Sequence, residues 1–438
     1  MSGWNSVNLT LLLSLCHSPY CWQRLPPFLF IDKTISIDNL LEEQHNRKTL
    51  KKLKAFIREG KMTEAMISAD DHIDLGYLPA DLFLERLPKE FKDRGPHVEE
   101  KNGKEMWVCD GATWGDWRAG KWSEDTKRPR VSLDRVKMDG RIGIRPTTTK
   151  LRLEDMDLDN IKFSVMYPPI FGMRMEDKEL GKAVIRAYND WAIDFCHGSS
   201  GRVLFVAQAS PSNPAEAVRE VERIASNPAV AAVTLAGFID LAEGQKWCDE
   251  KFDGVWQLLE SQGLPAAFHG GGSQHSLFAQ YQGEMKVVAH AISFPVDLML
   301  SLADLIFGNV LERFPDLRCG FYEANAGWVP YWLARLDDHG TGRQARFMQG
   351  GSVSLKPSEY FLRQCSVSCD PDEGTLPHVV DYLEGGNITF NTDYPHPDAP
   401  FPGAVDKFLE QPIPEDAKRK ILWDNSMDLY RDRITVGR

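Results

Sequence analysis

Short apolar runs alternate with longer amphipathic stretches along the chain from about residue 150 onward. The runs have the length of buried strands, and the longer stretches have helical periodicity, often with Pro, Asn or Asp near the start and Gly near the end. The predicted strands are 162–168, 203–209, 229–237, 266–270, 318–324, 365–371 and 388–394. The predicted helices are 179–196, 214–226, 248–262, 296–314, 326–337 and 373–384.

An eighth strand is predicted upstream, where ISADDHID begins at residue 67 with apolar and small residues and ends in three carboxylates and an imidazole. Eight strands alternating with helices predict an α/β fold, a closed (β/α)₈ TIM barrel. A doubly wound open sheet is the main rival. That fold usually carries a glycine-rich phosphate turn after its first strand, and here the turn reads DDHID.

Two segments fall outside this alternation. Residues 1–60 have no clear period at first and become basic and helical over 38–58, so we interpret them as an extension, partly helical or poorly ordered, before a barrel domain at 61–438. Residues 78–149 are rich in Pro, Gly, Trp and charge, and we interpret them as an insertion after the first strand, packed across the mouth of the barrel. Within it, 105–109 and the turn residues that follow predict a hairpin. Its tryptophans would either cover an aromatic substrate or pack the insertion.

Composition and charge narrow the classes of partner. A net charge of −12 provides no broad basic face, so nucleic acid is not an expected partner. The eight cysteines are scattered, which is typical of a reducing compartment. The apolar stretch at 9–16 follows no Lys or Arg and is too short for a membrane span. We therefore expect a cytoplasmic protein that acts on a small molecule, without a membrane partner, and leave a homodimer open.

Metal-capable side chains gather at the ends of the predicted strands, where a barrel of this type places its chemistry. Each has an ordinary structural alternative as a core histidine, a helix cap or a turn residue. Together, uncompensated carboxylates would repel one another, and a bound divalent cation resolves the crowding. The residues concerned are Asp70, His72, His269, Glu323, Asp370 and Asp393. Because side chains alternate along a strand, Asp70 and His72 point the same way and Asp71 points away; the role of Asp74 stays open.

Several longer motifs carry a family resemblance. They are ISADDHID, AYNDW at 187–191, LPAAFHGG at 264–271, LIFGNVLERFPDL at 305–317, EANAGWVPYWLARLD at 323–337, NTDYPHPD at 391–398 and ILWDNSMDLY at 421–430. In this order, from about residue 62 to 430, the chain resembles the amidohydrolase-related branch of the amidohydrolase superfamily. That branch includes aminocarboxymuconate-semialdehyde decarboxylase and resorcylate-type decarboxylases.

The resemblance implies one divalent metal ion held by four residues, Asp70, His72, His269 and Asp393. Two imidazoles and two carboxylates suit Zn²⁺, which we expect, or Mn²⁺. The chain departs from the family at two places. Asp70 stands where many relatives carry His, and Glu323 stands where the decarboxylases carry a His thought to act in acid–base chemistry.

The resulting functional hypothesis is a metal-dependent hydrolase. A metal-activated water would attack a C–N or C–C bond of a small carboxylated, aromatic or ring-derived substrate, with Asp393 as general base and then acid. Glu323 or His290 would replace the missing strand-six His. The alternative is a non-oxidative decarboxylase using the same metal, and a third hypothesis is a metal-free binding protein.

Four further residues are candidates for substrate contact: His396, Gly270, Gly271 and Trp328. The glycines after His269 would let substrate approach closely. The alternatives are a flexible connector for the glycines and, for His396, a hydrogen bond to a metal ligand.

Overall fold

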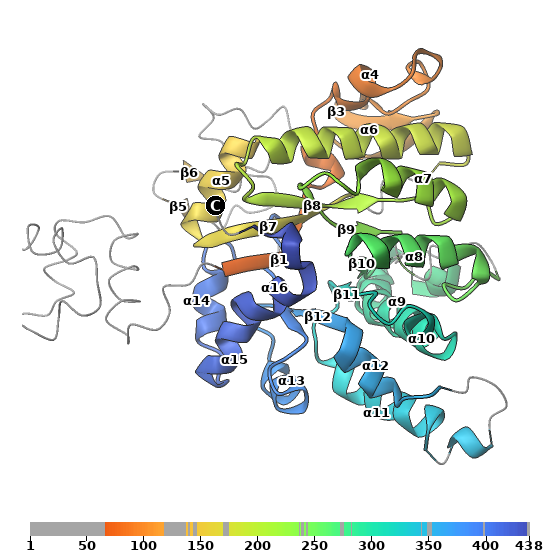
Figure 1. Cartoon of the computed structure of the whole chain (residues 1–438). Helices are drawn as coiled ribbons and strands as arrows, with labels where there is room; N and C mark the ends of the chain where they lie inside the picture. The colour runs from red at the N-terminus through yellow and green to blue at the C-terminus, as the bar shows by residue number, and fades with distance from the viewer. Residues whose placement is uncertain are drawn as a thin grey trace, which may run out of the picture. The chain divides into compact units, whose positions relative to one another are not determined.

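The computed structural model describes residues 66–117, 137–138, 141–142, 147–169, 175–235, 237, 241, 244–271, 276–281, 283–342, 344–347, 353–396 and 399–435 (Figure 1). The chain divides into two compact units, Met1–Glu64 and Ala65–Arg438. The predicted extension at 1–60, with its helix at 38–58, lies outside the described residues. All that follows concerns the second unit.

Eight strands form one parallel sheet whose spatial order follows the sequence. They are β1 (Met66–His72), β7 (Ile161–Tyr167), β8 (Val203–Gln208), β9 (Val230–Thr234), β10 (Ala266–His269), β11 (Cys319–Tyr322), β12 (Cys365–Cys369) and β13 (Ile388–Phe390). Each coincides with a predicted strand. With helices between them, they form a (β/α)₈ barrel, and the predicted fold class is confirmed.

The barrel closes between its first strand and the segment that follows its last. The backbone N–H of His72 donates to the carbonyl of Tyr394 at 2.6 Å, and that of Asp393 donates to the carbonyl of Asp70 at 3.1 Å. The register of β1 against β7 shifts between Ser68 and Asp71. The strand is therefore irregular where its polar side chains begin.

The barrel interior is filled by side chains from the strands and from the C-terminal helix α16 (Asn425–Tyr430). Aliphatic residues such as Ile67, Val165 and Val206 are fully buried there. Three tyrosines, Tyr167, Tyr322 and Tyr430, are buried with them, and the hydroxyls of Tyr322 and Tyr430 lie 2.9 Å apart. The interior is a packed core, so substrate access is restricted to the strand ends.

Helices follow most strands, as predicted. They include α6 (Lys178–His197), α7 (Pro214–Ile224), α8 (Asp253–Gln262), α9 (Lys286–Phe307), α11 (Trp328–Gly340) and α13 (Leu376–Leu383) (Figure 1). The start of α7 shows the expected signals, because Pro214 occupies its first turn and Asn213 accepts a hydrogen bond from the Glu216 N–H at 3.2 Å. The prediction missed α5 (Thr149–Leu158), α12 (Pro357–Gln364), α14 (Ala404–Leu409), α15 (Glu415–Arg419) and α16.

Helix α9 begins ten residues before its predicted start at 296 and encloses Pro295. Proline was taken as a boundary because it cannot donate to the carbonyl four residues earlier. That carbonyl belongs to Ala291, which is exposed, so water can replace the missing N–H. The stretch Gly283–Phe307 also has the length and apolarity of a membrane span, with a mean hydropathy of 1.4 over a window that is 44% buried in the fold. A helix packed on a barrel passes the same test.

The insertion after β1 contains α4 (Leu82–Arg86) and a three-stranded antiparallel sheet, β2 (His97–Lys101), β3 (Lys104–Cys109) and β4 (Ala112–Asp116). The predicted hairpin is β3–β4, and Asp110 and Gly111 both have positive φ, as its tight turn requires. Trp107 is fully buried and donates to the Leu75 carbonyl at 2.7 Å, so it packs the insertion onto the segment after β1.

Ion pairs also attach the insertion to α6. Arg86 pairs with Asp194 at 2.9 Å, and Arg94 pairs with Asp177 at 2.9 Å. The described part of the insertion therefore lies against α6 and the end of β1. Residues 118–136, which carry Trp122, lie outside the described ranges.

Candidate metal centre

The end of β1 supplies two buried side chains to the site. Asp70 is 0% exposed and His72 is 4% exposed. His72 Nε2 lies 3.5 Å from Asp70 Oδ1. Neither oxygen of Asp70 has a hydrogen-bond partner among the described residues, which is an unfavourable environment for a lone buried carboxylate.

His269 ends β10 and is 1% exposed. Its Nδ1 lies 2.9 Å from the carbonyl of Gly270, and since a carbonyl can only accept, Nδ1 carries a proton. In the neutral ring the lone pair is therefore on Nε2, which lies 3.7 Å from Asp70 Oδ1. Nε2 is the nitrogen that faces the site, and the tautomer leaves it available to a metal.

Asp393 follows β13 in a left-handed backbone conformation, with φ of 52°. Its Oδ1 lies 3.3 Å from His72 Nε2 and 2.7 Å from His396 Nδ1. Although burial favours the neutral acid, His396 and His72 hold the pKa of Asp393 below its usual range. The carboxylate is therefore ionised in this environment.

Glu323 follows β11 and is also left-handed, with φ of 59°. Its Oε2 lies 2.7 Å from His269 Nε2 and 3.7 Å from His72 Nε2. Burial disfavours a charged His269, but Glu323 and Asp70 outweigh it and raise the pKa of this imidazole to about 9. In the metal-free protein a proton on Nε2 thus compensates the surrounding carboxylates.

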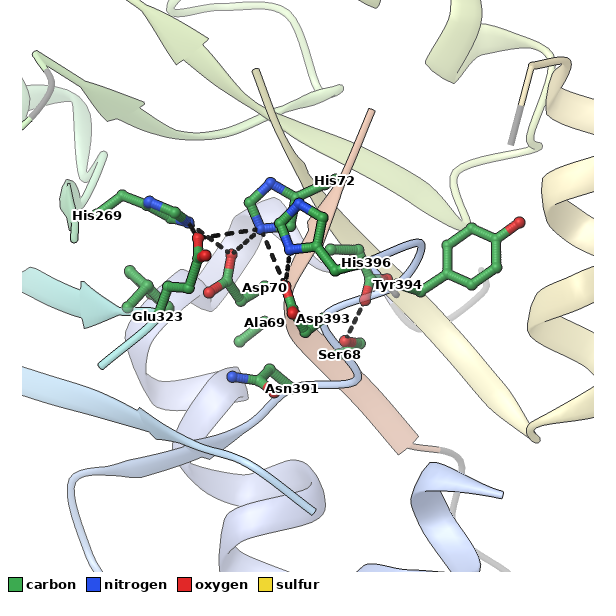
Figure 2. A network of polar contacts seen from close by, with 12 residues as sticks. Ser68, Ala69, Asp70, His72, His269, Glu323, Asn391, Asp393, Tyr394 and His396 are labelled. Atoms are coloured by element: carbon green, nitrogen blue, oxygen red, sulfur yellow. Dashed lines mark hydrogen bonds and ion pairs between the residues drawn. The ribbon is translucent and has the colours of Figure 1, made fainter. Parts of the chain in front are cut away.

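Five side chains converge from four strand ends, as Figure 2 shows. They are Asp70, His72, His269, Glu323 and Asp393. Donor atoms of Asp70, His72 and His269 lie close enough together to hold one metal ion, and so do those of His72, Glu323, Asp393 and His396. Burial, followed by repulsion from Glu323 and Asp393, raises the pKa of Asp70 well above its ordinary value despite the opposing His269. A divalent cation would supply the missing compensation, so the residues fit the group that the sequence predicts.

His396 lies beside the cluster rather than apart from it. Its ring stacks on that of His72 with centroids 4.1 Å apart, and its Nε2 lies 3.3 Å from Asp74 Oδ1. Asp74, which was left open, thus pairs with His396. The predicted alternative to substrate contact for His396 is a hydrogen bond to a metal ligand, and its contact with Asp393 corresponds to that alternative.

Three predicted residues are placed differently from expectation. His290 lies in α9, not in a loop, and is exposed on that helix, where its ring contacts Phe294. A Cβ atom added to Gly270 would lie only 3.0 Å from the side chain of Phe294. This glycine therefore allows α9 to approach the strand and does not leave room for substrate. Trp328 is 7% exposed and packs on Phe321, as a core residue does.

The remaining candidates lie near the site. Gly271 is buried directly after Gly270. Asp370, after β12, accepts hydrogen bonds from Asn325 at 2.5 Å and Asn391 at 3.4 Å. Burial, together with the charges of Asp393 and Glu373, raises the pKa of Asp370 to about 7.

Sequence reasoning missed Arg152, which is 0% exposed in α5. Its guanidinium donates to the carbonyl of His72 and lies over the ring of Tyr394, 5.1 Å from the centroid. It therefore supports both sides of the barrel closure. Only recognition of a helix directly after residue 148 would have drawn attention to it, and Arg152 lies in a stretch without a predicted element, between the insertion at 78–149 and the strand at 162–168.

Comparison with known proteins gives a family match. A family model described as Amidohydrolase matches residues 152–431. A 2-amino-3-carboxymuconate-6-semialdehyde decarboxylase of Dictyostelium discoideum is 27% identical over 139 residues, which is 31% of this chain. The match spans 37% of that relative's length, little more than a third.

Similar solved structures share the fold. An amidohydrolase from Mycobacterium avium subsp. paratuberculosis K-10 has a TM-score of 0.68 at 21% identity, over 84% of this chain and 100% of the other. A 5-carboxyvanillate decarboxylase from Sphingomonas paucimobilis has a TM-score of 0.56 at 25% identity, over 65% and 82%. A dihydroxybenzoic acid decarboxylase from Polaromonas sp. JS666 with bound manganese and 2-nitroresorcinol has a TM-score of 0.57 at 16% identity, over 84% and 97%.

Proposed function

Since the chain belongs to the amidohydrolase family, we propose that this enzyme is a metal-dependent, non-oxidative decarboxylase of a small aromatic or ring-derived carboxylic acid. The similarity to decarboxylases at 27% and 25% identity is the observation that supports this choice over hydrolysis. The sequence hypothesis ranked the two reactions in the opposite order, on the strength of Glu323 alone.

We place one divalent metal ion at the converging side chains of Asp70, His72, His269 and Asp393. When bound, the metal supplies a Lewis acid that fixes and polarises an oxygen of the substrate. Zn²⁺ remains our initial prediction, and the manganese in the Polaromonas decarboxylase makes Mn²⁺ the first alternative to test.

The protein's own groups would handle the proton. Decarboxylation breaks the bond between the ring carbon and its carboxylate, releases CO₂ and requires one proton at that carbon. Ionised Asp393 would relay this proton from His396 to the substrate, because its Oδ1 lies at the strand ends, 2.7 Å from His396 Nδ1. Burial of His72 and His269 excludes water from the inner side of the site.

Hydrolysis is the second candidate, and Glu323 is the observation that favours it. The family resemblance implies a His on the sixth strand of the decarboxylases, and a carboxylate there is better suited to accepting a proton from water than to donating one. A hydrolase would act on a C–N or C–C bond at the same site.

Product analysis separates the two reactions. The purified metal-loaded protein is incubated with a panel of aromatic carboxylates and amides in ¹⁸O-labelled water. We expect CO₂ release with no ¹⁸O in the organic product; label in the product would instead establish hydrolysis. His269→Ala should abolish both activity and bound metal, whereas His378→Ala, an exposed position on α13, should change neither.

A further inference from the structure

We propose that Glu323 is itself a ligand of the metal ion, so that this chain surrounds the ion with five protein donors rather than four. The inference rests on the proposed metal site and concerns the residue at which the chain departs from its decarboxylase relatives. It replaces the catalytic role that the sequence suggested for Glu323 with a coordinating one.

The first argument comes from the hydrogen bonds of His269. Its Nδ1 is committed to the carbonyl of Gly270, so a metal bound to this ring occupies Nε2. Nε2 then has no proton to give, and a hydrogen bond to Glu323 is impossible. In the metal-free protein the 2.7 Å between Glu323 Oε2 and Nε2 is the length of a hydrogen bond from the protonated ring. Once a cation displaces that proton, the two atoms face the same ion as neighbouring lone-pair donors.

The second argument is the spacing of the donor atoms. Donors about 2.1 Å from one ion lie roughly 3.0–3.5 Å apart when they are neighbours in its coordination sphere. The distances from His72 Nε2 to Asp70, Asp393 and Glu323 are 3.5, 3.3 and 3.7 Å. The distance from Glu323 to His72 is slightly above this range, and its 2.7 Å to His269 Nε2 is slightly below it. Glu323 nevertheless contacts one member of each group of donors that shares His72, which places its carboxylate between the two groups.

The third argument is the backbone. Glu323 has φ of 59°, a left-handed conformation that a side chain with a Cβ adopts at an energetic penalty. Asp393, a ligand in the site described above, has the same unusual conformation at φ of 52° after its own strand. The two strand ends thus turn a carboxylate toward the same point by the same local device.

Three carboxylates and two imidazoles make a harder, more anionic site than two of each. Such a donor set favours Mn²⁺ over Zn²⁺, because oxygen donors and higher coordination numbers suit Mn²⁺, whereas Zn²⁺ prefers four ligands rich in nitrogen and sulfur. Loss of Glu323 should therefore weaken Mn²⁺ binding more than Zn²⁺ binding.

The test compares Glu323→Gln with Asp370→Asn. Both replace a carboxyl group at a strand end by an amide, but Asp370 is hydrogen-bonded to Asn325 and Asn391 and is not among the converging donors. Metal affinity is measured by titration of the full chain with Mn²⁺ and with Zn²⁺. The coordination number is measured from the visible absorption of the Co²⁺-loaded protein, which strengthens as coordination falls from six towards four.

For Glu323→Gln we expect Mn²⁺ affinity to fall about 100-fold, a smaller loss for Zn²⁺ and a changed Co²⁺ spectrum. For Asp370→Asn we expect less than about a threefold change in affinity, as for a residue outside the coordination sphere, and an unchanged spectrum. A Glu323→Gln protein with the wild-type Co²⁺ spectrum overturns the inference, even if its affinity falls, because a residue that only orients a ligand also affects affinity.

Two controls keep the result interpretable. If Glu323→Gln does not fold, as judged by circular dichroism, Glu323→Asp decides by the same criteria, since it keeps the charge but withdraws the oxygens by one methylene. If the wild-type chain binds metal and the variant is spectroscopically identical, only the role of Glu323 is overturned. A wild-type chain that binds no metal overturns the proposed function with it.

Discussion

Asp70 and Asp71 are adjacent carboxylates on β1, both buried, in opposite electrostatic environments. Asp71 accepts hydrogen bonds from the hydroxyls of Ser68 at 2.7 Å, Thr392 at 2.6 Å and Ser164. Asp70 receives none from the described residues and faces two imidazoles and two further acids. The protein itself supplies the hydrogen-bond donors that the Asp71 carboxylate needs, whereas the Asp70 carboxylate needs a cation to compensate its charge.

The pKa values of Asp70 and Asp71 reflect this difference in their surroundings. Burial raises the pKa of both carboxyls, but for Asp71 the Arg152 charge and the three hydroxyls oppose the rise. Only His269 opposes it for Asp70, and Glu323 and Asp393 add to it. In metal-free protein, the stabilising contribution of neutral Asp70 is present at low pH and is lost as pH rises through its folded pKa.

Replacing Asp70 by Asn should have the largest effect on metal binding. We expect affinity to fall more than about 1,000-fold, beyond the 10–100-fold typical of residues that only orient a ligand. In the presence of a chelator, the variant should melt at or above the wild-type temperature at pH 7, because it replaces a buried acid that repels Glu323 and Asp393 and has no hydrogen-bond partner among the described residues. Metal titration and calorimetry provide the two measurements. A clearly lower melting temperature without metal would place Asp70 in a structural role like that of Asp71.

Replacing Asp71 by Asn should reverse this pattern. The Asn side chain presents N–H donors to hydroxyls that already donate, and Arg152 loses its nearby charge, so we expect destabilisation of about 3 kcal/mol. Metal affinity of the folded fraction should stay within about threefold. Urea unfolding in the presence of a chelator gives the free energy of unfolding. If metal affinity fell as far as in the Asp70 variant, the two carboxylates would not be separable.

Removing the metal from the wild-type chain should lower stability by an amount set by mass action. At a free metal concentration 100 times Kd, the bound ion stabilises the folded state by about 2.7 kcal/mol. Thermal unfolding with and without a chelator measures the difference. The Asp70 variant serves as the control, since its melting temperature should not respond to the chelator.

Replacing Ser164 by Ala should have the smallest effect. It removes one of the three hydroxyl donors to Asp71 and leaves the others, so we expect a loss of about 1–2 kcal/mol in the free energy of unfolding. Bound metal should remain stoichiometric by elemental analysis. A loss of metal in this variant would show that the two sides of β1 are coupled.

The sequence was informative where one local pattern decided the outcome. The strands were predicted because each is a short apolar run between clear breakers, and Asp70 and His72 because they end such a run two positions apart. The convergence of His269 and Asp393 with them followed from barrel geometry, in which all strand ends meet at one rim.

The remainder depended on long-range contacts or local exceptions. Two of the three hydroxyl partners of Asp71 come from residues 93 and 321 positions away, which no local pattern reveals. The direction of Glu323 depends on a positive φ that is uncommon for this residue type. His290 was placed outside a helix because the helix was predicted to start only after Pro295, whereas α9 begins at Lys286 and continues through that proline.

The site contains residues from both sides of the barrel closure, so its assembly depends on the order in which the chain is synthesised. The ends of the closing seam, marked by Ser68 and Thr392, are 324 positions apart, among the most expensive loops for a chain to close. During synthesis, a ribosome-bound chain holds Asp70 and His72 long before Asp393 exists. With Asp393 among the ligands, as proposed, high-affinity metal capture requires the last strand to have docked, so in a pulse-labelled chain the uptake of metal would report the docking of that strand.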